Sequence, residues 1–234
     1  MIKILAQTKI CNHSSLQFYI KIKTMRTYNS EQLITALQKQ TEGFLDKAVA
    51  EWQMLSSVKL LYQSSPEKWS AAQCLEHLNS YGDYYLPAIE NAILKAKQKN
   101  STASNEFVPG WFGNYFTELM LPKEDGKKIK KMKAMKAYSP INDLDASAVI
   151  SKFIDQQEKM LLLLEEARKV DLGKIHVPVS IAKWLKLKLG DTFLFVIAHN
   201  YRHVLQAQKA LECSGIKTVF VPSFSTINIK QAIG

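Results

Sequence analysis

The chain of 234 residues is 47% hydrophobic and 22% charged, which is enough apolar material for a sizeable buried core in one domain. Its net charge of +10 comes mostly from two lysine clusters, within residues 1–24 and 123–136, and neither is interleaved with aromatic residues as in nucleic-acid-binding modules. No apolar run reaches the roughly 20 residues that a membrane span needs, and three cysteines without a CxxC pair favour a reducing, cytoplasmic location.

The ends of the chain are expected to lie outside the domain. The first 24 residues contain four lysines, no acidic residue, and short apolar pieces that match neither a signal peptide nor an amphipathic helix. We therefore expect a basic N-terminal extension over residues 1–24, a domain over residues 25–215 and a C-terminal tail over residues 216–234.

Two long helices are predicted in the first half of the domain. The first opens at the cap Asn29-Ser30-Glu31, and apolar residues at helical spacing continue it until just before Ser64-Ser65-Pro66. The second begins at Ser70, where Gln73 completes a capping box, and runs towards Asn100 with a kink at Pro87.

Residues 101–140 are predicted to be a long irregular loop. Their large aromatic residues, of which Trp111 is the first, would be costly to expose together, so we expect them to cover something apolar. We hypothesise that the loop shapes the mouth of a pocket; closing one end of a bundle or forming a dimer contact are the alternatives.

Two more helices are predicted after the loop. One starts near Asp145, and after it Val177-Pro178-Val179 is expected to be a connector and Trp184-Leu185 a short helical turn. The last opens at Gly190-Asp191-Thr192 and stops at Gly215. The sequence thus predicts an all-α fold, an antiparallel four-helix bundle with a long loop between its second and third helices.

Three histidines are the candidate metal ligands. His199 and His203 lie four residues apart, which stacks their imidazoles on one face of the last helix, close enough to bind one divalent ion. His77, on the second helix, would complete a three-histidine site with coordination positions left for water or substrate. The alternative is that these are hydrogen-bonded core histidines without a metal.

Other polar residues follow the same helix faces. Gln73, Tyr81 and Tyr84 share a stripe with His77, and Gln206 lies one turn beyond His203, so these four and Trp111 are candidates for a pocket wall or for orienting a ligand. Each has an alternative role, as a helix cap, a core residue or a surface residue. Glu76 and His176 are not expected to be ligands. Arg202, placed about 100° from either histidine, is expected to form a salt bridge or an inter-subunit contact.

The order and spacing of two motifs resemble a known family. Trp69-Ser70 followed by Leu75, His77 and Leu78, and Leu189-Gly190-Asp191 followed by His199, His203 and Gln206, are similar to elements of the DinB/YfiT-like four-helix-bundle metalloproteins. The resemblance covers residues 30 to 213. It implies one divalent ion, zinc or nickel, held by His77, His199 and His203, and an S-transfer, isomerisation or hydrolysis reaction that differs between members.

We predict a metal-dependent transferase or hydrolase that acts on a small-molecule substrate and activates a thiol or a water. The resemblance suggests that a low-molecular-weight thiol is among its substrates. No Asp or Glu is visibly placed as a general base, which favours thiol transfer over hydrolysis. The alternatives are a non-catalytic bundle in which metal or histidines stabilise the core or a homodimer, and a basic nucleic-acid-associated protein.

Overall fold

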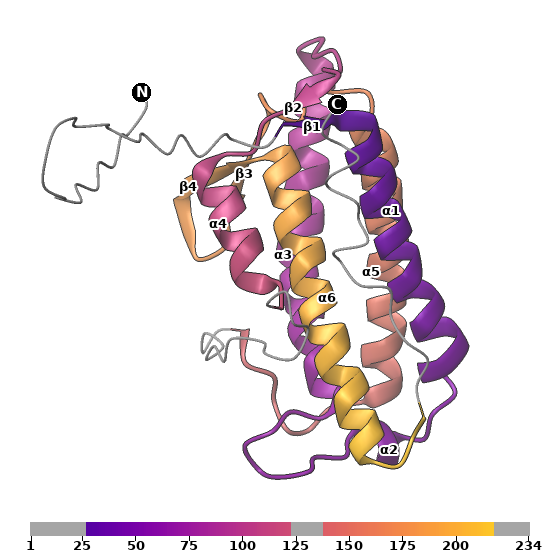
Figure 1. The fold of residues 1–234 in the computed structure, drawn as a ribbon. Coiled ribbons are helices and arrows are strands. Elements are labelled where there is room, and N and C mark those ends of the chain that lie inside the picture. The colour runs from indigo at the N-terminus through magenta and orange to yellow at the C-terminus, as the bar shows by residue number, and fades with distance from the viewer. Residues whose placement is uncertain (1–26, 123–137, 218–234) are drawn as a thin grey trace, which may run out of the picture.

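Four long helices form the body of the protein in the computed structural model, which describes residues 27–122 and 138–217 (Figure 1). They are α1 (Ser30–Lys47), α3 (Ala71–Gln98), α5 (Ala146–Ala167) and α6 (Leu189–Cys213). The four-helix bundle predicted from the sequence is confirmed. The expected extension over residues 1–24 and most of the expected tail over residues 216–234 lie outside the described residues. No helix in the described ranges is both long and apolar enough to cross a membrane.

Three of the helix ends form where the local sequence predicts them. Ser70 Oγ accepts a hydrogen bond from Gln73 N at 3.1 Å, and Gln73 Oε1 accepts one from Ser70 N at 3.0 Å, which completes the capping box of α3. Asp145 caps α5 by accepting bonds from the backbone of the first turn. Gly215 has φ +88°, the left-handed conformation that ends many helices.

The first predicted helix is interrupted. α1 ends at Lys47, a π-helical turn follows over Ala48–Trp52, and a separate short helix α2 covers Ser57–Leu60. Trp52 is completely buried, so the wider turn places its ring in the core.

The helix directions explain the long connection between α3 and α5. Three ion pairs join α3 to α5, and in each the partners are 69 residues apart in the sequence, so the two helices run in the same direction. A chain leaving the end of α3 must therefore travel back about 40 Å, the length of a 28-residue helix, before α5 can begin. Residues 99–145 connect the two helices in the sequence.

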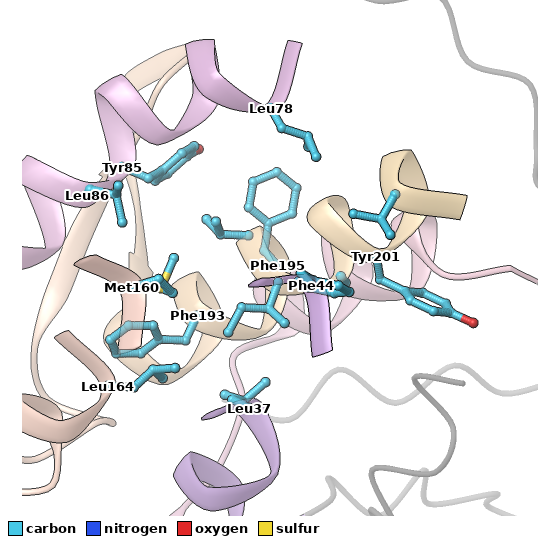
Figure 2. Packing of buried hydrophobic residues seen from close by; sticks show 14 of the residues in the cluster. Leu37, Phe44, Leu78, Tyr85, Leu86, Met160, Leu164, Phe193, Phe195 and Tyr201 are labelled. Carbon is cyan, nitrogen blue, oxygen red and sulfur yellow. The ribbon is translucent and has the colours of Figure 1, made fainter. Parts of the chain in front are cut away.

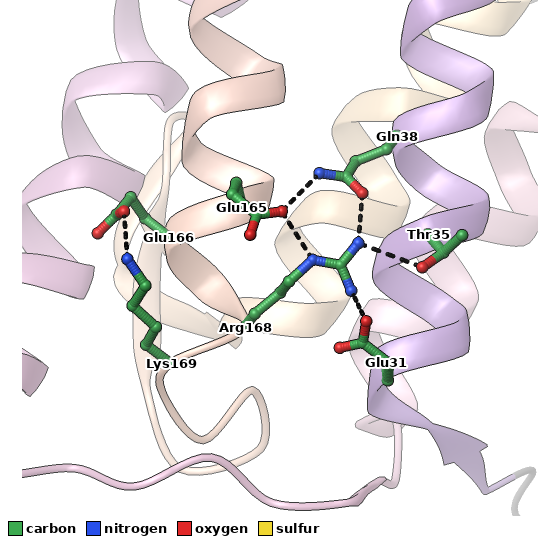
Figure 3. A network of polar contacts seen from close by, with 7 residues as sticks. All are labelled: Glu31, Thr35, Gln38, Glu165, Glu166, Arg168 and Lys169. Atoms are coloured by element: carbon green, nitrogen blue, oxygen red, sulfur yellow. Dashed lines mark hydrogen bonds and ion pairs between the residues drawn. The ribbon is translucent and has the colours of Figure 1, made fainter.

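α1 also packs against α5 and runs antiparallel to it. Arg168, just after α5, contacts Glu31, Thr35 and Gln38 of α1 and also Glu165 (Figure 3). These partners are largely exposed, so the network contributes modestly to stability but fixes the register of the two helices.

The core lies between the four helices (Figure 2). α1 contributes Leu37 and Phe44, while Tyr85 comes from α3 and Phe193 from α6. α6 is buried on every side from Leu189 through Val204, as expected of a helix enclosed by neighbours. α1, α3 and a further helix, α4, cover it.

That further helix corrects one sequence prediction. Residues 111–120, expected to be irregular, form α4 (Trp111–Met120), which packs along α6 (Figure 1). Its N-cap Gly110 donates a backbone hydrogen bond to Asp191 Oδ2 at 2.9 Å, and Gly113 lies directly against the Asp191 side chain. The helix therefore depends on a partner 81 residues away in the sequence.

A second correction concerns residues 176–188. In place of the expected connector and helical turn they form an antiparallel hairpin of β3 (His176–Val179) and β4 (Ala182–Lys188). Val177 pairs with Leu187, and both are buried, which places one face of the hairpin on the helices. A smaller ladder joins β1 (Tyr28–Asn29) to β2 (Glu106–Phe107).

Asp191 gives the α4–α6 contact a pH dependence. Burial raises the pKa of Asp191 to about 6, although the Gly110 N–H bond and the nearby Lys188 charge act in the opposite direction. Because the pKa of Asp191 is higher in the folded than in the unfolded protein, protonated Asp191 favours the folded state. This contribution to the free energy of unfolding is fully present below about pH 4 and is lost as the pH rises through about 6.

Asp191→Asn keeps an acceptor for Gly110 but does not titrate. We expect the free energy of unfolding of the wild type to fall by about 3 kcal/mol relative to this variant between pH 4 and pH 8. Urea denaturation across that range measures the difference, and parallel profiles would contradict it.

Candidate metal centre

The three predicted histidines converge between α3 and α6. Their ligand nitrogen atoms all lie within 4.8 Å of one another, and the Nε2 atoms of His77 and His199 are 3.2 Å apart. All three side chains are buried. The four-residue spacing on α6 brings the rings of His199 and His203 to a centroid distance of 4.7 Å.

Two of the three donor atoms are already spaced as ligands of one divalent ion are. Two imidazole nitrogens bound to one tetrahedral zinc, each about 2.0–2.1 Å from it, lie about 3.3–3.4 Å apart. The 3.2 Å separation of the His77 and His199 nitrogens is close to that spacing. Three neutral nitrogen donors also suit nickel and similar ions.

Hydrogen bonds on the far side of two rings leave Nε2 available. His77 Nδ1 lies 2.6 Å from the Tyr138 carbonyl oxygen, so it donates its N–H there. His203 Nδ1 lies 3.0 Å from Gln206 Oε1 and donates in the same way. His199 Nδ1 is buried and has no hydrogen-bond partner among the described residues. The outer partners of His77 and His203 orient their rings as the outer partners of metal-bound histidines do.

The electrostatic environment keeps the imidazoles neutral. Burial lowers the pKa of His77, lowers that of His203 to about 3, and places that of His199 well below its usual range. The Arg202 charge lowers all three further. Neutral imidazole is the form that binds metal, and the lowered pKa values keep all three histidines in that form at neutral pH.

The cluster lies in the wall of a cavity of about 1040 Å³. α3, α4, α6, the β3–β4 hairpin and the loop before α3 surround it. The Trp69 ring stacks on His203 at a centroid distance of 5.8 Å, and the Tyr81 ring lies 4.3 Å from that of His199. The three imidazoles therefore adjoin space for a small molecule.

The other predicted pocket residues divide into two groups. Tyr81 and Gln206 line the cavity. Gln73, Tyr84 and Trp111 do not: Gln73 caps α3, the Tyr84 hydroxyl approaches the Pro178 carbonyl at 3.5 Å, and Trp111 is 69% exposed.

The structure confirms the expectation for the aromatic loop in one respect and leaves the other a prediction. Phe116 of α4 lines the cavity, as expected of a segment near its mouth. Trp111, Phe112 and Tyr115 are about half exposed or more, so in the described part of the chain they do not cover an apolar surface. They contact one another in place of the core.

Arg202 is a cavity residue that the sequence prediction did not include among the pocket candidates. It is only 7% exposed and lines the cavity beside the histidines. Three helical residues turn through about 300°, so Arg202 lies about 60° from His199, not about 100°. The i,i+3 spacing was the available signal. Glu76 and His176 are outside the cluster, as expected: Glu76 accepts a bond from Asn79 and His176 is exposed on β3.

Comparisons with known proteins identify the family of the chain. The chain is similar to YfiT from Bacillus subtilis, a solved structure described as a probable metal-dependent hydrolase with an unusual four-helix bundle topology. The identity is 11%, the match covers 89% of this chain and 95% of that one, and the TM-score is 0.44, too distant to bear on the reaction. No curated protein matches the chain. A family model described as the DinB superfamily matches residues 40–207, and the chain therefore belongs to the DinB superfamily.

Proposed function

We propose that the protein is a metal-dependent enzyme in which His77, His199 and His203 hold one divalent ion, zinc or nickel, beside a cavity for a small-molecule substrate. The observation that carries this proposal is the position of the cluster in the wall of a cavity of about 1040 Å³. A purely structural site is normally closed by its own protein ligands, whereas a catalytic site leaves a position open towards substrate.

The bound ion would supply Lewis acidity, which lowers the pKa of a thiol or water placed next to it. The protein's own groups shape what reaches that position. Burial raises the pKa of Tyr81 to about 12, so its hydroxyl stays protonated and can donate a hydrogen bond but cannot act as a base near neutral pH. Trp69 covers His77 and His203 and limits the access of bulk water.

Thiol transfer suits this site better than hydrolysis. Among the described residues, no carboxylate joins the three imidazoles, and Glu67, the one acidic residue in the described cavity lining, is exposed. Hydrolysis benefits from a base that takes a proton from water. A thiol is already partly ionised near neutral pH and depends less on a general base, so a low-molecular-weight thiol is the preferred substrate class.

The test is a paired activity screen on zinc-loaded and nickel-loaded protein. One assay follows consumption of glutathione or cysteine with an alkylating acceptor, and the other follows ester hydrolysis of p-nitrophenyl acetate. We expect thiol consumption to exceed that of the His199→Ala variant by at least about tenfold, since the variant lacks one ligand. If both proteins give equal rates in both assays, the site is not catalytic and the non-catalytic alternative holds.

A cytoplasmic location and a homodimer belong to the same proposal. Cys74 is buried and Cys213 exposed, and both are free thiols, which suits a reducing compartment. The exposed aromatic side chains of α4 would suit a contact between two copies. Sedimentation of the wild type and of a Trp111→Ala/Phe112→Ala variant distinguishes a dimer formed through α4 from a monomer.

A further inference from the structure

One stripe of α6 forms a continuous wall of the cavity. The lining positions Phe195, His199, Arg202, Gln206 and Lys209 follow one another at spacings of three or four residues, which keeps them on one helix face. Arg202 therefore lies one turn beyond His199, about 4.5 Å further along the helix axis. Lys209 lies two turns beyond Arg202.

The charges that line this cavity are mostly positive. Arg202 is buried, whereas Lys68 and Lys209 are exposed at the rim, as is the single lining carboxylate, Glu67. The imidazoles are neutral for the reasons given above. In the described residues the lining thus carries three cations against one anion, with the buried cation nearest to the histidines.

The rest of the described lining is largely apolar. Phe116, Leu119 and Met120 of α4 line the cavity on one side, and Val179 and Leu187 of the hairpin contribute on another. Such a surface binds a hydrocarbon or aromatic group and excludes water from the charged group beside it. A guanidinium in such surroundings interacts strongly with a carboxylate or phosphate, which its planar set of donors can bind through two parallel hydrogen bonds.

We propose that the cavity binds an amphipathic organic anion whose carboxylate or phosphate contacts Arg202 and whose apolar part packs against α4 and the hairpin. Lys68 and Lys209 at the rim attract the anion towards the opening. The assignment rests on the proposed function only in taking this cavity as the substrate site. It names the class of the second substrate, which would react with the thiol: a small anion with an apolar body.

The test compares three ligands that differ in one group. 4-Phenylbutyrate, 4-phenylbutanamide and 3-phenylpropyl phosphate are titrated into the EDTA-treated full-length protein and followed by isothermal calorimetry. EDTA treatment removes direct binding of the anion to a metal. We expect at least one of the two anions to bind the wild type at least about tenfold more tightly than the uncharged amide, and the tighter of the two identifies the group. Equal affinities for both anions and the amide would overturn the proposal.

Two variants assign the effect to Arg202. Arg202→Gln should remove most of the preference for the anion, whereas Lys39→Gln, on an exposed part of α1 outside the cavity, changes the net charge equally and should leave it intact. Equal losses in both variants would overturn the proposal. If Arg202→Gln fails to fold, Arg202→Lys takes its place, since lysine retains the charge but not the paired donors. An affinity of Arg202→Lys for the anion equal to that of the wild type would overturn the bidentate contact.

These measurements separate the anion site from the metal site. Metal content is determined in parallel, and Arg202→Gln should retain the wild-type amount, since Arg202 is not among the clustered nitrogen donors. A protein that binds the anion through Arg202 but shows no turnover would contradict the proposed function and leave this inference standing. Turnover without any preference for the anion would support the proposed function and contradict this inference.

Discussion

Replacing any one of His77, His199 and His203 with alanine is expected to reduce the zinc or nickel bound by the purified protein from about one equivalent per chain to less than about a tenth. The three nitrogen donors come from two helices, and their positions are held by packing and by the Tyr138 and Gln206 hydrogen bonds. With one donor gone, the remaining two imidazoles bind an ion far more weakly. Elemental analysis of the dialysed proteins measures the loss.

The matched control for this experiment is His176→Ala. His176 is a histidine of the same chain that is exposed on β3, outside the cluster, so its removal should leave the metal content unchanged. Added zinc should also raise the melting temperature of the wild type and of the control but not of the three variants, because only a folded site with three donors gains from binding. Wild-type metal content in all three variants would show that the histidines are core residues without a metal.

Gly113→Ala is expected to destabilise the protein by about 3 kcal/mol. A Cβ atom at position 113 would lie 2.1 Å from Cγ and 2.3 Å from Cβ of Asp191. The Asp191 Cβ is fixed by the backbone of α6, so rotating the side chain does not relieve the contact, and α4 must move away. Because Phe116, Leu119 and Met120 of α4 line the cavity, ligand binding should weaken as well. Denaturant unfolding measures the first effect.

Gly82→Ala is the control, because it adds the same methyl group to another glycine inside a helix. The three atoms nearest to the new Cβ would all belong to the amide end of Gln156, which is flexible and can swing away. That movement costs the Gln156 hydrogen bonds to Asn79 and Asp83, but alanine stabilises a helix by about 1 kcal/mol relative to glycine. We expect a net change within about 1 kcal/mol. Equal destabilisation by the two variants would show that the Asp191 contact does not hold α4 in place.

Much of the bundle could be predicted because the deciding interactions are local. The caps at Ser70, Asp145 and Gly215 act within one or two turns, so the residues that start or stop each helix lie next to one another in the sequence. The pairing of His199 with His203 is local in the same sense, since a single turn of helix brings them together. For these features the sequence pattern and the structure agree.

The features that the sequence did not reveal depend on distant residues. α4 is held by Asp191, which is 81 residues beyond Gly110, and the hairpin buries Val177 and Leu187 only because helices lie beneath it. The parallel course of α3 and α5 shows itself in ion pairs between residues 69 positions apart. Propensity over a short window contains no information about such contacts, which is why residues 111–120 read as a loop.

The candidate site divides along the same line. Sequence alone determined which side chains share a helix face, and so it identified His77, His199 and His203 as candidates. Only the tertiary structure decided that the faces of α3 and α6 meet, bringing residues 122 positions apart to 3.2 Å, and that Arg202 and Trp69 share the resulting cavity. The reason is physical: the positions of side chains on one helix follow from its 3.6-residue period, whereas the packing of two helices depends on the whole core between and around them.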